Sequence, residues 1–400
     1  MKRFRFCYYL SIILLLLAGL GTGRREYYFM LTVMLLVVGY AFLLNIWTIV
    51  SFSYIQELNM QSCVKGNSAM LKIGIYNDKP FPFTMMKVIV EMPPPAQRAE
   101  LSFNLDPNSH IYYDIPIHCA YRGVYDIGMT VLEVNDVFGL LKIRFDLRHL
   151  PYYRQRSLVV YPRLLQLAHL PAAMRDAKYS GGGTQQVSED GESFSDTRQY
   201  RFGDPFKRVH RILSARKRQL FVKRYDVPME TAAIIAVDTR DPGLEGELAL
   251  RYADIACECA AAITHYCLRT GYVVDLVSSD EKDPVAAGRS PRDFSKIYDR
   301  LAIMPFNSKD GDICAAVHAD MRRHPNLKAV YIITSRPAVQ IAEELSMLIN
   351  AGCAVKCLAP VCGGADDRCP ANFVSMPAPG VTEAVITSAD DIAGILGELS

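Results

Sequence analysis

Oxygen-bearing side chains follow an apolar run in the second half of the chain. The run AAIIAVD ends at Asp238, and Thr239 and Asp241 come shortly after it. A continuous apolar run of this kind is typical of a buried parallel strand, and sites in such sheets lie at the carboxyl ends of the strands. Because carboxylate and hydroxyl oxygens bind hard divalent cations, and a bound metal can activate water, these residues indicate a magnesium-dependent hydrolase as one hypothesis.

Two arginines favour a different use of the same strand ends. Arg240 lies between the two acids, and Arg336 follows the later apolar run AVYIITS. An arginine brings a positive charge to the place where a metal would bind, whereas a guanidinium group pairs well with a carboxylate. We therefore expect no cofactor, and we expect Asp238, Arg240 and Arg336 to contact a partner without a metal.

A strongly basic stretch precedes this region. Between Arg198 and Arg224 there are ten lysines and arginines against one acid, Asp204, whereas the whole chain has a net charge of only +2. Internal ion pairs around Asp204 are the favoured interpretation, and contact with anionic lipid or with an acidic partner is the alternative. Nucleic acid is not expected as a partner, because few aromatic side chains interleave with the basic ones.

Catalytic patterns of other kinds are not found in the sequence. The eight histidines are scattered, and the spacing of Cys353, Cys357, Cys362 and Cys369 fits no zinc ribbon. The segment GGGT lacks the lysine that a phosphate-binding loop requires. We therefore predict that the protein is not an enzyme.

Two domains are expected to carry these residues. Apolar runs and amphipathic segments alternate over 230–400, which predicts a parallel sheet with helices on both faces. Short runs with a period of two over 57–165 predict an antiparallel β-sandwich. Residues 166–229 form the connection between them, in which Gly203 to Pro205 are expected in a turn and Lys207 to Ala215 on a short helix.

An N-terminal membrane hairpin is predicted for residues 1–56. Phe6 to Gly23 and the stretch after Glu26 carry no charge, and each is long enough to span a bilayer. A cleaved signal peptide is the alternative for the first stretch. The basic residues before the first span and the irregular cysteines favour a multi-pass cell-membrane protein whose large domains lie in the cytoplasm.

The chain resembles the bacterial family named domain of unknown function 58. The resemblance rests on RGxYxxG in the β-domain, on VFGL where the family has PFGL, and on a motif in the connecting segment. The motif residues are Arg198, Tyr200, Gly203, Asp204, Arg208, Ser214, Ala215 and Arg216. Arg211 stands where the family usually has tryptophan, and Val137 replaces a proline.

This resemblance implies a fold and a partner. The expected C-terminal domain resembles the von Willebrand factor A fold, in which a DxSxS motif binds magnesium for adhesion; here Arg240 and Pro242 occupy the two serine positions. The implied partner is a MoxR-type AAA+ ATPase. We thus expect a membrane-anchored interaction or scaffold protein, active in assembly or maturation of envelope or other complexes. A metal-dependent hydrolase or adhesion domain that uses Asp238, Thr239 and Asp241 is the alternative.

Overall fold

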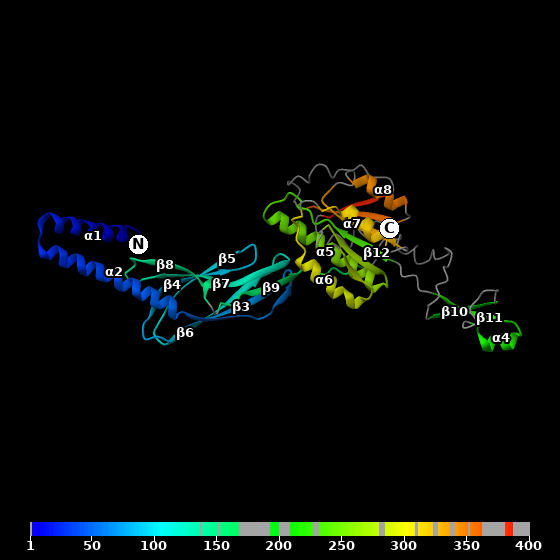
Figure 1. Cartoon of the computed structure of the whole chain (residues 1–400), viewed down its shortest axis with the longest axis horizontal. Coiled ribbons are helices and arrows are strands. Elements are labelled where there is room, and N and C mark those ends of the chain that lie inside the picture. Colours follow the sequence, from blue (N-terminus) through cyan, green and yellow to red (C-terminus); the bar gives the residue numbers. More distant parts are fainter. Residues whose placement is uncertain are drawn as a thin grey trace. The chain divides into compact units, whose positions relative to one another are not determined.

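The computed structural model divides the chain into two compact units, Met1–Arg163 and Leu164–Ser400 (Figure 1). Within the described residues, the first unit holds two long helices and nine strands, and the second holds a six-stranded sheet with its helices and a two-stranded sheet. The structure describes residues 2–136, 138–150, 153–167, 193–199, 209–226, 232–279, 285–308, 311–322, 327–336, 341–350, 353–361 and 381–386.

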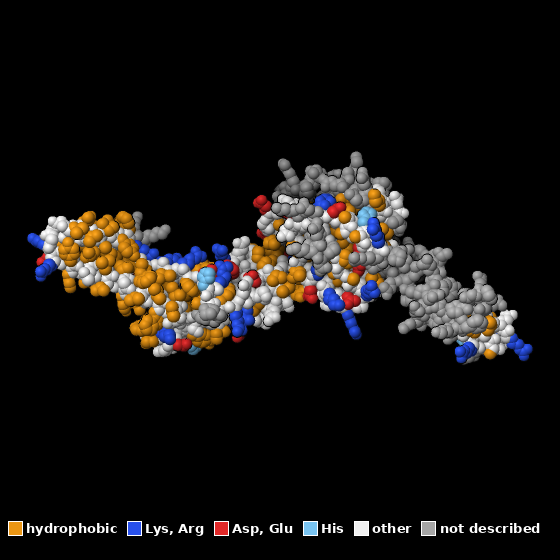
Figure 2. Space-filling view, viewed as in Figure 1, with side chains coloured by type: hydrophobic (Ala, Val, Ile, Leu, Met, Phe, Trp, Pro, Cys, Tyr) orange, Lys and Arg blue, Asp and Glu red, His pale blue; other side chains and the backbone are white. Residues whose placement is uncertain are grey.

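Two antiparallel helices begin the first unit. They are α1 (Lys2–Thr22) and α2 (Arg25–Ser51), joined at Gly23, whose positive φ of 65° suits a glycine in a tight turn. Both helices are long and apolar enough to cross a membrane. Figure 2 shows hydrophobic side chains covering their surface. The predicted helical hairpin is therefore confirmed, and its insertion into a bilayer stays a prediction.

The rest of the first unit is a β-sandwich, as predicted. One sheet has the order β1-β3-β6, and the other has the order β2-β9-β7-β4-β5 with β8 paired to β7. Apolar side chains from both sheets form one core, and all pairs except β2 with β9 are antiparallel. The strands are β1 (Ser53–Leu58), β2 (Ser62–Val64), β3 (Ser68–Asn77), β4 (Phe83–Glu91), β5 (Arg98–Leu105), β6 (Ser109–His118), β7 (Gly123–Asn135), β8 (Lys142–Asp146) and β9 (Arg156–Tyr161).

A glycine of the RGxYxxG pattern has a structural role in this sandwich. Gly128 has a φ of 138°, and a Cβ there would lie 2.6 Å from Oε1 of Gln56. The Gln56 side chain donates to the Arg154 carbonyl at 2.8 Å and accepts from the Met129 amide at 3.1 Å. Gly128 therefore makes room for an amide that joins β1 to β7 and to the segment before β9.

The six-stranded sheet of the second unit has the order β14-β13-β12-β15-β16-β17. All neighbouring pairs are parallel except β13 with the edge strand β14. This order reverses direction at β12, as in doubly wound sheets of the von Willebrand A type, so the predicted fold class is confirmed. The strands are β12 (Ala232–Val237), β13 (Val273–Ser278), β14 (Val285–Gly288), β15 (Leu327–Ile333), β16 (Ala354–Pro360) and β17 (Val381–Ile386).

Helices cover both faces of this sheet. On one face, α5 (Glu247–Arg269) and α6 (Phe294–Ile303) share a core with alternate residues of β12, β13 and β15. On the other, α7 (Ile313–Met321) and α8 (Ala342–Asn350) pack on the remaining strand residues. Because both faces are covered, the strands are mostly apolar, and buried Asp275 in β13 and Lys356 in β16 are exceptions within them.

Two short strands and a helix come from the connecting segment. They are β10 (Ser193–Gln199), α4 (Arg211–Lys217) and β11 (Phe221–Asp226), and β10 pairs antiparallel with β11. The helix begins four residues later than the sequence predicts, because Val209 pairs with Val222 of β11 and His210 caps the helix by accepting from the Leu213 amide at 3.2 Å.

Candidate functional site

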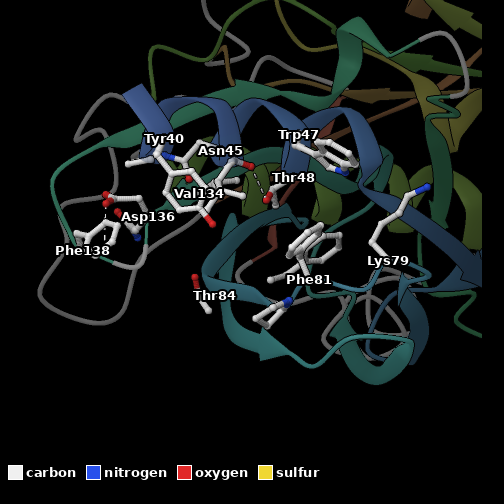
Figure 3. Close-up of a pocket in the computed structure, with 15 residues that line it drawn as sticks. Tyr40, Asn45, Trp47, Thr48, Lys79, Phe81, Thr84, Val134, Asp136 and Phe138 are labelled. Carbon is white, nitrogen blue, oxygen red and sulfur yellow. Dashed lines mark hydrogen bonds between the residues drawn. The ribbon is translucent and has the colours of Figure 1, made fainter. Parts of the chain in front are cut away.

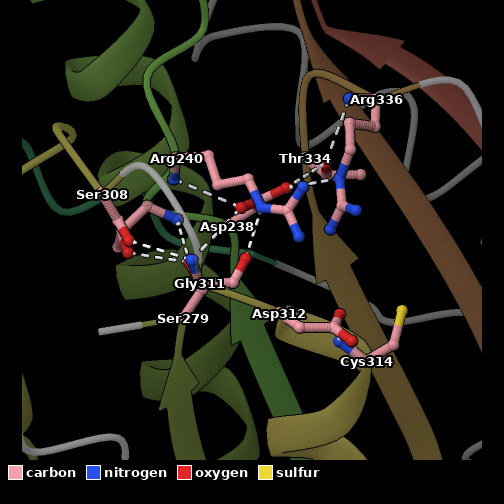
Figure 4. A network of polar contacts seen from close by, with 10 residues as sticks. Asp238, Arg240, Ser279, Ser308, Gly311, Asp312, Cys314, Thr334 and Arg336 are labelled. Carbon is pink, nitrogen blue, oxygen red and sulfur yellow. Dashed lines mark hydrogen bonds and ion pairs between the residues drawn. The ribbon is translucent and has the colours of Figure 1, made fainter. Parts of the chain in front are cut away.

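Asp238 lies at the carboxyl end of β12, where the strand order reverses. Its side chain is 2% exposed, and four donors surround its two oxygens (Figure 4). Oδ2 accepts from Arg336 Nε at 3.0 Å and from Thr334 Oγ1 at 2.8 Å. Oδ1 accepts from the Arg240 amide at 3.2 Å and from Ser279 Oγ at 3.3 Å. The carboxylate is thus fully engaged within the chain.

The ion pair between Asp238 and Arg336 joins two neighbouring strands. Arg336 follows β15, and its side chain is 20% exposed, so the pair is largely shielded from water. The Arg336 amide donates to Thr334 Oγ1 at 3.0 Å, which fixes the turn from which the guanidinium reaches back to Asp238. In this arrangement a cation of the chain itself neutralises the strand-end carboxylate.

Thr239 and Asp241 make their hydrogen bonds with other residues of the chain. Thr239 is buried, its amide donates to Ser279 Oγ at 2.8 Å, and its hydroxyl contacts the same oxygen at 2.8 Å. The exposed Asp241 accepts from the Gly243 amide at 2.9 Å, so its carboxylate stabilises its own loop. The Asp241 amide in turn donates to the Ser308 carbonyl at 3.2 Å. The carboxylates of Asp238 and Asp241 therefore bind different groups of the chain and do not converge on one metal position.

Arg240 is held by the loop that precedes α7. Its Nε donates to the Gly311 carbonyl, and Gly311 N donates to Ser308 Oγ at 3.2 Å. A Cβ on Gly311 would lie 2.2 Å from the Ser279 carbonyl oxygen, so only glycine fits there. Arg240 is half-buried, which leaves part of its surface open to a partner.

The oxygen atoms around Asp238 do not form a suitable set of ligands for a divalent cation. A magnesium ion needs an octahedron of free oxygen ligands, whereas the oxygens of Asp238 already accept from Arg336, Thr334 and Ser279. No cluster of three metal-binding side chains occurs in the described residues. These hydrogen bonds compete with a metal at Asp238, Thr239 and Asp241, and thermal unfolding with and without magnesium tests whether one binds.

The family-motif residues are described only in part. Ser214 is buried on α4, and its Oγ accepts from the Phe221 amide at 2.8 Å, which ties the helix to β11. Ala215 and Arg216 are exposed on the same helix. The backbone of Arg198 pairs with Val222 across β10 and β11. The remaining motif residues, Tyr200, Gly203, Asp204 and Arg208, lie outside the described residues, as do Cys362 and Cys369.

Two residues of the site, Ser308 and Gly311, are not among the candidates from the sequence. Ser279 directly follows the apolar run of β13, as Thr239 follows that of β12, so it lies at one of the strand ends where a site is predicted. Ser308 and Gly311 lie between α6 and α7, more than 60 positions from Asp238, and carry no pattern of their own. Only the fold brings them to the strand ends.

The chain is similar to one protein family and to several solved structures. The model of the family described as protein of unknown function DUF58 matches residues 196–352, so the resemblance is confirmed for that region. The search of curated proteins finds no significant match. Among solved structures, the VWA domain of SpRpn10 is similar with 9% identity and a TM-score of 0.31, over 42% of this chain and 95% of that one. Proximal thread matrix protein 1 from the mussel byssus is similar with 12% identity and a TM-score of 0.29, over 43% of this chain and 46% of that one. This chain thus spans less than half of the mussel protein.

Proposed function

We propose that this chain, whose residues 196–352 match the DUF58 family, is a non-enzymatic, membrane-anchored interaction protein. Its α/β domain would engage a MoxR-type AAA+ ATPase, and the pair would act in assembly or maturation of envelope or other protein complexes. The N-terminal hairpin would hold the chain in the cell membrane, with the larger domains in the cytoplasm.

The observation that carries this proposal is the ion pair of Asp238 with Arg336. In a metal-dependent adhesion site, a partner's carboxylate completes the shell of the metal. Here the cation that faces the carboxyl edge of the sheet is an arginine held 3.0 Å from Asp238, with Arg240 beside it (Figure 4). A carboxylate of a partner can bind such guanidinium groups directly, which supports recognition without a metal.

The hydrolase alternative receives no support from the geometry. Catalysis by a metal-activated water requires acids that share a ligand position, whereas Asp241 is exposed and binds its own loop. Asp238 is buried and neutralised, so it is poorly placed to accept a proton from water.

A pull-down tests the proposed partner. The full chain, solubilised in mild detergent, would be mixed with a purified MoxR-type ATPase in the presence of ATP, and the bound fraction would be measured. We expect Arg240→Ala to weaken binding by about tenfold or more, because it removes a charged contact. Arg322→Ala is the matched control, since Arg322 follows α7 at the opposite, amino end of the neighbouring strands.

The expected pattern is retention by the unmodified chain and by Arg322→Ala, with loss in Arg240→Ala. Addition of a chelator to an ATP-free preparation should leave retention unchanged, because no metal bridges the two proteins. If the ATPase is not retained, or if both arginine variants bind alike, the proposed use of this edge is wrong.

A further inference from the structure

A cavity in the first unit lies between the end of α2 and two turns of the β-sandwich. Its volume is about 310 Å³. Figure 3 shows side chains of the helix on one side and those of the β3–β4 and β7–β8 turns on the other. Most of the lining is apolar or aromatic, and it includes Tyr40, Leu44, Trp47, Phe81, Phe83 and Phe138. Cavities of roughly 300–1,000 Å³ with such linings commonly bind small molecules.

One buried polar atom in the wall lacks a hydrogen-bond partner among the described residues. Asn45 is 2% exposed, and its Nδ2 makes no hydrogen bond within the described part of the chain. A buried amide donor without an acceptor is costly, because it has lost its hydrogen bonds to water. Since Asn45 lines the cavity, a ligand with a hydrogen-bond acceptor would satisfy it.

The two ends of the cavity differ in charge. Lys79 and Trp47 lie at one end in Figure 3, and Asp136 and Phe138 lie at the other. Lys79 has no ion pair in the described residues, so its ammonium group can meet an anion. Asp136, in contrast, accepts from the amides of Phe138 at 3.1 Å and Leu141 at 2.6 Å and is thereby occupied by its own turn.

The lining helix places the cavity near a membrane surface. The 27 residues of α2 are about 40 Å long, whereas the hydrocarbon layer is about 30 Å thick. The last two turns of α2 therefore extend beyond the layer. The start of α1 lies at the same level, because Arg5 Nε donates to the Gly139 carbonyl and Tyr9 donates to the Leu140 carbonyl at 3.4 Å.

Exposed aromatic side chains at this level fit a lipid boundary. Trp47 is 55% exposed, Phe81 48% and Phe138 46%, and the rings of Trp47 and Phe81 meet edge to face at 6.1 Å. Aromatic side chains gather where headgroups meet the acyl chains, and a lysine at the same depth attracts anionic headgroups.

We propose that this cavity binds one anionic phospholipid of the surrounding membrane. Part of an acyl chain lies against the aromatic side chains of the lining, an ester carbonyl accepts from Asn45 Nδ2, and the phosphate lies near Lys79. The volume admits part of a lipid and leaves the remainder in the bilayer. This inference rests on the proposed membrane anchoring, which the test below examines separately.

The test uses the full chain in mild detergent. Trp47 is the single tryptophan of the sequence, so its fluorescence reports the cavity wall without interference. Phosphatidylglycerol with brominated acyl chains is titrated, and we expect quenching that saturates at about one lipid per chain, with weaker binding of phosphatidylcholine. Native mass spectrometry of the same samples counts the bound phospholipid.

Two variants test the assigned contacts. Asn45→Leu removes the unpaired donor and should weaken lipid binding by about tenfold without loss of folding. Lys79→Gln should abolish the preference for phosphatidylglycerol over phosphatidylcholine. Thr32→Leu on an exposed part of α2 and Lys72→Gln on β3 are matched controls, since neither residue lines the cavity.

Flotation with lipid vesicles separates the two proposals. A chain that does not float with vesicles refutes the membrane anchoring. If the chain floats but quenching never saturates, or if Asn45→Leu and Lys79→Gln behave like their controls, the lipid site is wrong and the anchoring stands. Flotation together with a saturable, variant-sensitive signal supports both.

Discussion

Replacement of Arg336 by serine should destabilise the α/β unit and make it sensitive to magnesium. The change removes the guanidinium that lies 3.0 Å from the buried Asp238 carboxylate. Loss of one partner from a buried ion pair costs about 3–5 kcal/mol, because the other charge stays buried without compensation. For a unit of this size each kcal/mol lowers the melting temperature by about 2–4 °C, so we expect a decrease of about 6–20 °C.

A divalent cation should partly reverse this loss. Removal of Arg336 takes the positive charge away from Oδ2 of Asp238, and the hydroxyls of Thr334 and Ser279 lie within hydrogen-bond distance of the same carboxylate. At a magnesium concentration 100 times the Kd, binding would stabilise the variant by about 2.7 kcal/mol, or about 5–11 °C. The unmodified chain should show no such shift, because its own arginine occupies this position.

Thermal unfolding of the full chain in detergent, followed by circular dichroism with and without magnesium, measures both effects. Arg322→Ser is the control for loss of an exposed arginine, and Arg336→Ser combined with Asp238→Asn should lose the magnesium response. Equal melting temperatures of Arg336→Ser and the unmodified chain would contradict this prediction. Equal stabilisation of both chains by magnesium would contradict it as well.

Three further predictions concern other buried groups. Gly311→Ala should lower the melting temperature by several degrees, whereas Gly39→Ala, which has open space around its Cβ, should not. Burial lowers the pKa of Lys356 to about 8. Between about pH 8 and 10.5 the unfolded chain therefore binds more protons than the folded chain, and the free energy of unfolding should rise with pH over this range. Urea titrations at several pH values should show this rise, and Lys356→Met should remove it. The sulfurs of Cys63 and Cys119 lie 3.1 Å apart, and burial raises the pKa of Cys63 to about 12. If the β-sandwich faces the cytoplasm, both thiols should be alkylated after denaturation of cell extracts. A disulfide between them would contradict that orientation.

The fold could be predicted where the hydrophobic pattern is long and simple. The uncharged stretches gave α1 and α2, and the alternating runs gave the strands of the sandwich. The hydrophobic pattern does not predict β14 or β17. The first is only VAAG, whose small residues have weak strand propensity, and the second is placed by its pairing with β16. Edge strands of this kind depend on the neighbouring strand more than on their own residues.

In the candidate site, only residues that follow an apolar strand could be predicted from the sequence. Asp238 and Arg336 each follow an apolar run, so both are recognisable, and their charges suggest that they could meet. The sequence cannot show that the guanidinium takes both the place and the charge of a metal, because that depends on the adjacency of β12 and β15. It also cannot show Gly311 against Ser279, since that contact joins loops from different parts of the chain.

An arginine in the place of a metal ion also changes the conditions under which a partner can be released. A metal site can be emptied by a chelator or by a fall in metal concentration, whereas Arg336 is part of the chain and always charged. A partner's carboxylate that binds Arg336 would compete with Asp238, so its net gain at that arginine is a difference between two ion pairs. Such a contact at the edge of the domain weakens with ionic strength, because exposed charges are screened over about 10 Å at 0.1 M salt. Complexes of this chain should therefore dissociate in salt and persist in chelator, which is the reverse of the behaviour of a metal-bridged complex.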